Sequence, residues 1–136
     1  MTMRKIKFRG KRIDTGEWVY GDIIQWEDGT VDIAPIDRDN IQHTVNSDTV
    51  GQYTGLKDRN GREIYEGDIL MCIGQRGDNK GHKYYRKVLF ENGSFCMNVR
   101  YYRINSPLCN HIVNKELGWE VIGNIRDNQE LLEEEK

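Results

Sequence analysis

The sequence contains few prolines and cysteines and lacks any long hydrophobic run. Its two prolines exclude a proline-rich linker. Three cysteines, an odd number without paired spacing, do not indicate the disulfide framework of a small secreted protein. No stretch approaches the roughly 18 apolar residues of a membrane span, and no apolar segment follows the basic start as in a signal peptide. We therefore expect a protein of the reducing cytoplasm with no membrane partner.

Short strands separated by turns account for most of the chain. Its 14 glycines count against long helices, because glycine is a poor helix former. Residues 5–9 alternate basic and apolar side chains, which is typical of a half-buried strand. Similar patterns recur, with turn signals about every eight to twelve residues. The sequence therefore predicts an all-β fold of bent sheets or a small SH3-like barrel. The expected core comprises Ile6, Phe8, Trp18, Ile23, Tyr53, Ile64, Ile69, Leu70, Val88, Phe90, Trp119, Val121 and Ile122.

The length of 136 residues suits a single domain over 1–136 or two small subdomains within it. The division we expect lies between 1–58 and 59–126, and the two parts could be intertwined. One short helix is predicted near 107–113, with Ser106 as its N-cap and Pro107 at its first position. A second is predicted over the tail, 127–136, where Asp127 and Glu130 resemble a capping box.

Glycine, asparagine and aspartate mark the turns and bends. A glycine lets the backbone bend, and the following aspartate can bond nearby amides and hold the bend. An asparagine–glycine pair suits the positive backbone angles of a hairpin tip. The residues expected to act in this structural way are Gly21, Asp22, Asn60, Gly61, Gly67 and Asp68.

One sequence pattern that predicts a bend occurs twice in the chain. From Asn60 the chain reads NGREIYEGDIL, and from Thr15 it reads TGEWVYGDII, with one residue fewer before the second glycine. Both copies are followed by an aromatic–acid–turn–glycine stretch. An internal duplication and a chance likeness of turn-rich strands both explain this pattern. Either way, two copies favour a structural role for Asp68 over a catalytic one.

Candidate ligands for metals and cofactors are sparse. The histidines His43, His82 and His111 are scattered, and Cys109 with His111 is the only close pair. Zinc sites generally show two such pairs, or two histidines on one helix. No phosphate-binding glycine loop of the P-loop type is present. We therefore expect no catalytic residue, no metal and no cofactor.

Charge is strongly segregated although the net charge is only −2. Residues 4–12 carry six basic groups and no acid, and residues 14–68 carry thirteen acids against four basic groups. Residues 76–103 carry seven basic groups and two acids. Such blocks can pair within one fold, or between subunits, or they can face a charged partner.

Basic and aromatic residues interleave in the third block. Tyrosines can stack on bases while lysine and arginine follow phosphates. Along a strand one tyrosine of each pair points in and one out, so only half of them could face a ligand. Ordinary cross-strand pairing explains the same pattern. The candidate nucleic-acid-binding residues are Lys83, Tyr84, Tyr85, Arg86, Lys87, Arg100, Tyr101, Tyr102 and Arg103.

Three stretches together resemble the YopX family of phage and prophage proteins. They read MRKIKFRGKR at the start, YTGLKDRNGREIYEGDIL in the middle and GWEVIGNIRDNQELL near the end. The resemblance spans nearly the whole chain and implies a small, mainly β protein expressed in the cytoplasm of a bacterial host. It implies no established activity and supplies no catalytic residues. Similar sequences often have proline where Gln129 stands here, which bears only on where the tail helix begins.

Two functions from different classes follow. The first is a non-enzymatic phage or prophage accessory protein that binds another protein or itself, since spare strand edges make a homo-oligomer plausible. The alternative is a nucleic-acid-binding module that uses the 83–103 hairpin and the basic N-terminal strand. A small-molecule enzyme is a third and weaker hypothesis, because no acid, base and nucleophile converge in the sequence.

Overall fold

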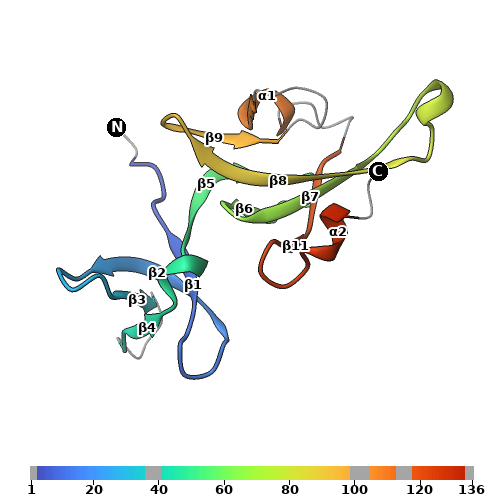
Figure 1. The fold of residues 1–136 in the computed structure, drawn as a ribbon. Coiled ribbons are helices and arrows are strands. Elements are labelled where there is room, and N and C mark those ends of the chain that lie inside the picture. The colour runs from blue at the N-terminus through green and yellow to red at the C-terminus, as the bar shows by residue number, and fades with distance from the viewer. Residues whose placement is uncertain (1–2, 36–40, 99–104, 113–117, 134–136) are drawn as a thin grey trace. The chain divides into compact units, whose positions relative to one another are not determined.

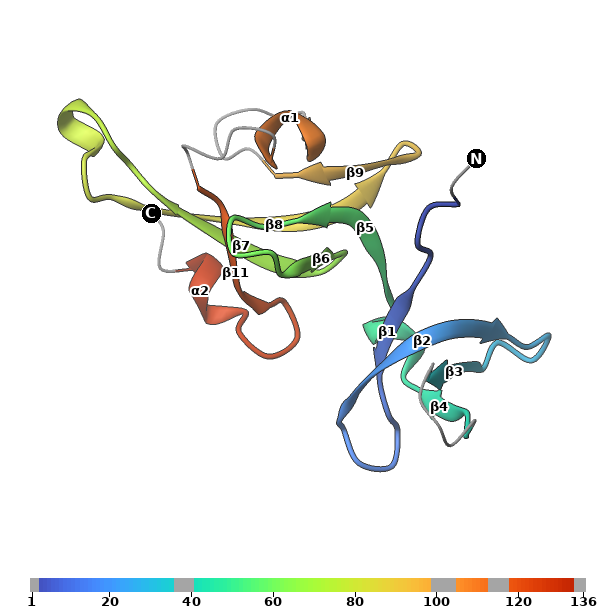
Figure 2. The same ribbon diagram turned by 180° about the vertical axis from the view of Figure 1, so that it is seen from behind.

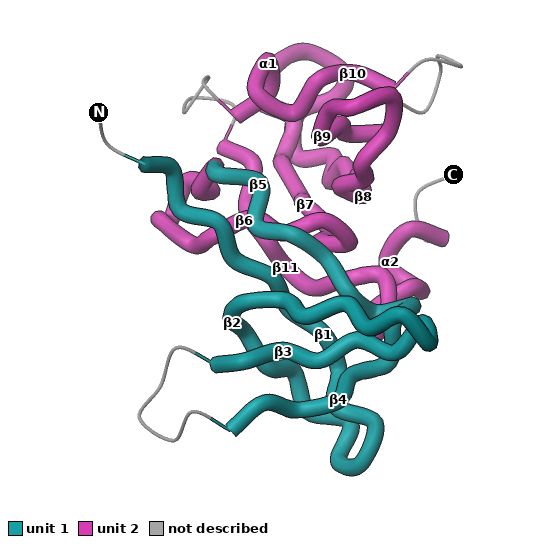
Figure 3. The backbone as a smooth tube through the Cα atoms, turned by 90° about the vertical axis from the view of Figure 1, so that its left-hand side faces the viewer, with its two compact units in different colours: residues 1–55 teal, residues 56–136 magenta. Residues whose placement is uncertain are grey.

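The computed structural model describes residues 3–35, 41–98, 105–112 and 118–133. The fold is mostly β, with antiparallel sheets and two short helices (Figures 1 and 2). The chain divides into unit 1, Met1–Gly55, and unit 2, Leu56–Lys136 (Figure 3). The sequence placed this division three residues later, between 58 and 59.

Unit 1 is a small, curled antiparallel sheet. Its neighbouring strands run β4-β3-β2-β1-β5. The residue after β1, Arg12, forms a bridge with Val45 of β4, so the sheet closes on itself. This is the small barrel that the turn spacing predicted. The strands are β1 (Phe8–Lys11), β2 (Trp18–Gln25), β3 (Val31–Pro35), β4 (His43–Val45) and β5 (Gly51–Lys57), with the 3-10 turn η1 (Ser47–Thr49) before β5.

The core of unit 1 is small and apolar. Val31, Ile33 and Val45 are buried at its centre. Partly buried side chains complete it, namely Phe8, Val19, Ile23 and Val50. Alternation along β1 and β2 directs Phe8 and Val19 inward, because successive side chains of a strand point to opposite faces. The cations of β1 therefore lie on the other face of this sheet.

Unit 2 is built on a second antiparallel sheet, in the order β10-β9-β8-β7-β11. The residues of β5 after Gly55 pair with β6 across a turn that Asp58 N closes by donating to Arg62 O at 2.8 Å. The strands are β6 (Glu63–Tyr65), β7 (Asp68–Ile73), β8 (Lys83–Glu91), β9 (Ser94–Met97), β10 (Ser106–Pro107) and β11 (Glu120–Asn124), with the 3-10 turn η2 (Gly77–Asn79) between β7 and β8.

The core of unit 2 lies on one face of this sheet. The buried cluster comprises Ile64, Leu70, Val88, Met97, Leu108 and Val121. Leu70 stands opposite Val121 across β7 and β11, and Val88 stands opposite Met97 across β8 and β9. These cross-strand pairs bring residues from three parts of the sequence onto one apolar surface.

Within the described residues, the two helices begin later than the sequence predicted. α1 covers Cys109–Ile112, and α2 covers Glu130–Glu133. Ser106 and Pro107 do not open α1, because they pair with Met97 and Cys96 as strand β10. Asp127 lies before α2 in a turn, where its carboxylate accepts a bond from the Asn124 side chain. Among the described residues, neither helix is long and apolar enough to cross a membrane.

The core prediction is correct for six residues and wrong for two. Tyr53, Ile64, Ile69, Leu70, Val88 and Val121 are buried. Ile6, which precedes β1, is 40% exposed, and Phe90 is 53% exposed because the β8–β9 hairpin extends past the core. The half-buried residues are Phe8, Trp18, Ile23, Trp119 and Ile122. The sequence did not single out Ile33, Val45, Met97 and Leu108, which are almost fully buried.

Candidate functional site

The candidate nucleic-acid residues of β8 divide between the two faces of the strand. Tyr84 and Arg86 lie on the face of Val88, which belongs to the core, and Arg86 is 9% exposed. Lys83, Tyr85 and Lys87 lie on the opposite face, because strand side chains alternate. Both lysines are exposed and Tyr85 is half-buried. The strand therefore presents two cations and one tyrosine together, rather than five residues.

Tyr84 is held by its neighbours on the core face. Its ring meets the His82 ring edge to face, with 4.6 Å between centroids. The Arg86 guanidinium lies 5.7 Å from the Tyr84 ring centroid and donates to the backbone oxygen of Tyr85 at 2.8 Å. This packing explains how an arginine can be buried in a small β unit. It also makes Arg86 and Tyr84 poor candidates for contact with a ligand.

The second half of the predicted hairpin site cannot be placed. Arg100, Tyr101, Tyr102 and Arg103 lie outside the described residues. The turn between β8 and β9 has Asn92 at φ 53° and Gly93 at φ 77°, the positive angles that suit an asparagine–glycine pair at a hairpin tip. β8 pairs with β9 from Val88 to Glu91.

The hairpin on the other side of β8 carries cations that the sequence prediction did not include. Arg76 and Lys80 lie in the connection between β7 and β8, and both are exposed. With Lys83 and Lys87 they give four exposed cations on one hairpin, against Asp78 as the single acid from residue 69 to 90. The charge count over 76–103 contained this signal, whereas the basic–aromatic pattern covers only 83–87 and 100–103.

A second basic–aromatic arrangement lies on β1 and β2. The charged ends of Arg9 and Lys11 lie 4.7 and 5.4 Å from the Trp18 ring centroid, and Lys7 lies 5.9 Å from that of Tyr20. Trp18 therefore stacks with cations on the face opposite to the core, where the sequence had expected a core residue. All five side chains also make further interactions within the protein, and Arg9 is only 5% exposed. These side chains are thus already engaged within the protein, which makes this face a poorer candidate for contact with a ligand.

Asp58 ties two distant stretches of unit 2 together. Its Oδ1 accepts from the backbone N–H of Asn60 at 2.9 Å and of Arg62 at 2.8 Å, and its Oδ2 accepts from that of Val121 at 2.9 Å. Next to it, Arg59 N donates to Trp119 O at 3.1 Å. Asp58 is 7% exposed and serves three backbone donors. The middle and C-terminal stretches quoted for the family resemblance are thus neighbours in space.

Gly67 and Asp68 form the turn between β6 and β7. Gly67 has φ 91°, a value that side chains other than glycine rarely adopt. Its N–H donates to Val88 O and its carbonyl accepts from Ile125 N, each at 2.8 Å. Asp68 is 2% exposed, and its Oδ2 accepts from the backbone N–H of Tyr65 at 2.7 Å. The carboxylate thus bonds the backbone of its own turn.

Gly21 and Asp22 do not form an equivalent bend. β2 keeps an unbroken register through Gly21 on both sides, against Phe8 and Pro35. A side chain on Gly21 would place its Cβ 2.1 Å from Ala34 O, so this glycine allows a close approach of two strands. Asp22 is exposed. The two copies of the motif therefore have different local structures, and the bend predicted at Gly21 is wrong.

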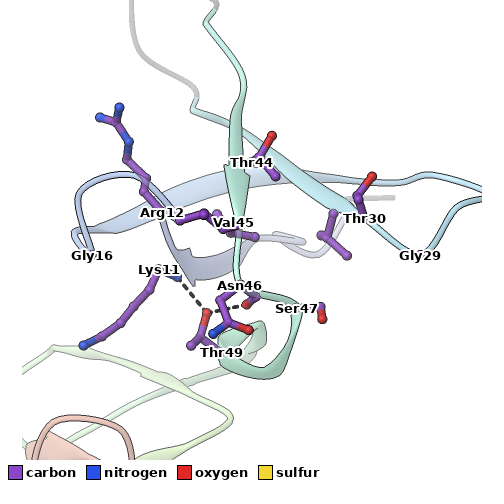
Figure 4. Close-up of a pocket in the computed structure, with 12 residues that line it drawn as sticks. Lys11, Arg12, Gly16, Gly29, Thr30, Thr44, Val45, Asn46, Ser47 and Thr49 are labelled. Atoms are coloured by element: carbon purple, nitrogen blue, oxygen red, sulfur yellow. Dashed lines mark hydrogen bonds between the residues drawn. The ribbon is translucent and has the colours of Figure 1, made fainter.

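Unit 1 has a hollow of about 500 Å³ (Figure 4). It is lined by the end of β1, the β2–β3 turn and the β4–η1 segment. Lys11 and Arg12 extend in different directions in Figure 4, and Arg12 pairs with Asp14 at 2.7 Å. Lys11 N and Asn46 O instead bond the Thr49 hydroxyl, at 2.8 and 2.6 Å. These polar groups stabilise the chain where it closes the barrel.

The described residues contain no group of three or more histidine, cysteine, aspartate or glutamate side chains that could hold a metal ion. Cys72 and Cys96 are buried, and Cys109 is exposed at the start of α1.

Two aspartates of unit 1 bond to residues close to them in the sequence. The Thr30 hydroxyl and amide lower the pKa of Asp28 in the β2–β3 turn, and the Arg12 guanidinium lowers the pKa of Asp14.

We expect His111 to make the stability of unit 2 depend on pH. Partial burial lowers the pKa of His111, and the charge of Arg86 lowers it further. The unfolded chain therefore takes up this proton at a higher pH than the folded chain, so stability should fall as the pH drops from about 7 to about 5. Urea unfolding followed at Trp119 should show a smaller drop for His111→Gln than for the wild type. The exposed His82 provides the matched control, and an equal effect of His82→Gln would contradict this account.

Comparison with known proteins identifies the family of this chain and a solved structure with a similar fold. A family model described as "YopX protein" matches residues 7–133. The fold is similar to the crystal structure of protein EF1440 from Enterococcus faecalis, with a TM-score of 0.60 and 24% sequence identity over 96% of this chain and 99% of that chain. At that identity the likeness establishes a shared fold. No curated protein matches significantly. Because the family model spans nearly the whole chain, this protein belongs to the YopX family.

Proposed function

We propose that this protein is a phage or prophage accessory protein that binds nucleic acid in the cytoplasm of a bacterial host, without catalysing a reaction. The observation that carries the proposal is the basic hairpin, which we define as residues 71–87, formed by β7, β8 and their connection. It exposes Arg76, Lys80, Lys83 and Lys87, with Asp78 as its single acid. Cations held on one structural element supply the phosphate contacts that dominate nucleic-acid affinity.

The carboxylates support binding over catalysis. Asp58 and Asp68, two buried carboxylates of unit 2, bond backbone N–H groups of their own turns. A general acid or base needs a position within reach of a substrate. Both residues are less than 10% exposed. Their geometry fits a role in folding.

Salt dependence provides the test. Two to four phosphate contacts should make the affinity for a labelled DNA duplex fall roughly 12- to 150-fold between 50 and 200 mM salt. Fluorescence anisotropy at the two salt concentrations measures this directly. Lys83→Ala combined with Lys87→Ala should weaken binding and lower the salt slope by about two.

The matched control is Lys57→Ala with Arg62→Ala, which removes two exposed cations of β5 and the following turn. It should leave the affinity within about twofold, although the net charge changes equally. Poly-glutamate of similar length serves as the competitor of the other macromolecular class. The proposal fails if no salt-sensitive binding appears at micromolar protein, or if poly-glutamate displaces the DNA at equal charge concentration.

A second candidate function, self-association, rests on the β8–β9 hairpin. Phe90 is 53% exposed and meets Phe95 edge to face, with 5.1 Å between ring centroids. Phe95 is half-buried and packs against the core of unit 2, so it supports the exposed Phe90 ring, which can anchor a second copy of the chain. Sedimentation should then show a concentration-dependent oligomer that Phe90→Ser abolishes. Ile13 is also an exposed apolar residue, and Ile13→Ser should leave the oligomer intact. A monomer at high concentration would contradict this candidate.

A further inference from the structure

The basic hairpin is the narrow end of the unit 2 sheet. Among the described residues, β11 pairs with β7 as far as Met71, and the chain at the end of β9 is bonded to β8 as far as Lys87, whose carbonyl accepts from Asn98 N at 3.2 Å. The pairing of β7 with β8 continues to Ile73 and Lys83. Figures 1 and 2 both show this hairpin extending beyond β9 and β11. The described part of the chain thus forms a two-stranded ribbon here.

The end of the ribbon is a closely bonded turn. Gly74 N donates to His82 O at 2.8 Å, and Gly81 N donates to Gly74 O at 2.9 Å. A Cβ on Gly74 would lie 2.0 Å from Asn79 O, so the turn closes tightly over this glycine. His82 N donates to Asn79 O at 3.0 Å. These bonds hold Arg76 and Lys80 at the tip of the ribbon.

The tyrosines of this hairpin are not placed for stacking on bases. Tyr84 already contacts His82 and Arg86 on the core face. Tyr85 is half-buried and makes other interactions within the protein. Binding of single strands depends on open aromatic rings on which successive bases stack. The cations are exposed and the rings are occupied, which favours a duplex whose phosphates are contacted from a groove.

The dimensions of the ribbon select among duplexes. Two paired strands lie about 4.8 Å apart in the direction of their hydrogen bonds. The major groove of B-form DNA is about 12 Å wide and admits a two-stranded ribbon, whereas the minor groove is about 6 Å wide. Five residues from Cys72 to Arg76 reach up to about 16 Å, which exceeds the groove depth of about 8.5 Å. The major groove of A-form RNA is too narrow.

Resting on the proposed nucleic-acid function, we propose that the basic hairpin inserts into the major groove of double-stranded DNA. Arg76 and Lys80 at the tip enter the groove, while Lys83 and Lys87 contact phosphates at its edge. Because the hairpin enters the groove tip first, the tip cations should contribute more to the affinity for duplex DNA than to the affinity for the other two ligands. Single strands and duplex RNA offer no groove of matching width.

The discriminating experiment compares three labelled ligands of one sequence and length by anisotropy at about 100 mM salt. Duplex DNA should bind at least about tenfold more tightly than the single strand or duplex RNA. Equal or tighter binding of the single strand would overturn the groove proposal while leaving nucleic-acid binding intact. Absence of binding to all three would overturn the proposed function itself.

Competitors and variants test the groove directly. Methyl green, which occupies the major groove, should displace the protein, and netropsin, which occupies the minor groove, should not; the reverse result would contradict the proposal. Arg76→Ala with Lys80→Ala should weaken duplex binding about tenfold and leave single-strand binding within about twofold. Tyr85→Leu should change neither affinity by more than about twofold. A larger loss for the single strand with Tyr85→Leu would instead indicate stacking.

Discussion

Replacement of Asp58 by alanine is expected to destabilise unit 2 by about 4 kcal/mol. The carboxylate accepts from the amides of Asn60, Arg62 and Val121, and the last of these bonds is buried. A bond to a charged acceptor contributes about 1.5–3 kcal/mol, and a buried donor left without an acceptor costs about 1–3 kcal/mol. Urea unfolding followed through the signal of Trp119 should therefore show a large shift of the unfolding midpoint. Trp119 lies next to this turn, because its carbonyl accepts from Arg59 N.

Two comparisons keep this prediction sharp. Asp58→Asn retains one acceptor oxygen but sets an amide group against a backbone N–H, so its loss should be intermediate. Asp28→Ala removes an exposed turn aspartate whose Oδ1 accepts from the amide and hydroxyl of Thr30. It should cost no more than about 1 kcal/mol, because exposed donors can bond water instead. Equal losses for Asp58→Ala and Asp28→Ala would show that the bond between the two stretches contributes little.

Substitution of Gly67 by valine is expected to cost roughly 3 kcal/mol and to weaken the same unit. A backbone angle of φ 91° excludes a β-branched side chain without strain of about 1–3 kcal/mol. Relief of that strain would require the turn to shift. The shift would break the bonds from Gly67 N to Val88 O and from Ile125 N to Gly67 O. Thermal unfolding by circular dichroism measures the combined loss.

The neighbouring aspartate tests whether this turn is structural or functional. Asp68→Asn should reduce stability, because Asp68 is 2% exposed and accepts from Tyr65 N. Gly16→Val supplies a matched glycine control, since Gly16 has φ 74° in an exposed turn with open space around it. It should carry only the backbone strain. If Asp68→Asn left folding intact and abolished DNA binding, the structural account of this turn would be wrong.

The fold class was within reach of the sequence because its signals are local. Alternation, glycine-containing turns and the Asn92–Gly93 tip depend on neighbouring residues, so the strands and most turns could be predicted. Pairing at a distance could not. Ser106 and Pro107 suit a helix start by local rules, yet pairing with Met97 and Cys96 makes them a strand. Gly21 reads like Gly67 in sequence, but close approach to β3 gives it a different role.

The candidate binding site shows the same division. The sequence supplied the basic block and the alternation that splits Tyr84 from Tyr85. It could not show that Arg86 is buried, because burial depends on Val88 belonging to a core assembled from distant strands. Nor could it show that Arg76 and Lys80 stand at the tip of a ribbon. That depends on where β9 and β11 stop pairing with their neighbours.

By itself the sequence determined the β class, the position of the turns, the segregation of charge and the resemblance to the YopX family. These properties depend on residue types and short spacings, which can be read directly from the sequence. The tertiary structure alone decided which cations remain exposed, which tyrosines contact other side chains and which carboxylates bond backbone N–H groups. Asp58 shows why: its third donor, Val121, is distant along the chain, and only the folded sheet brings the two together.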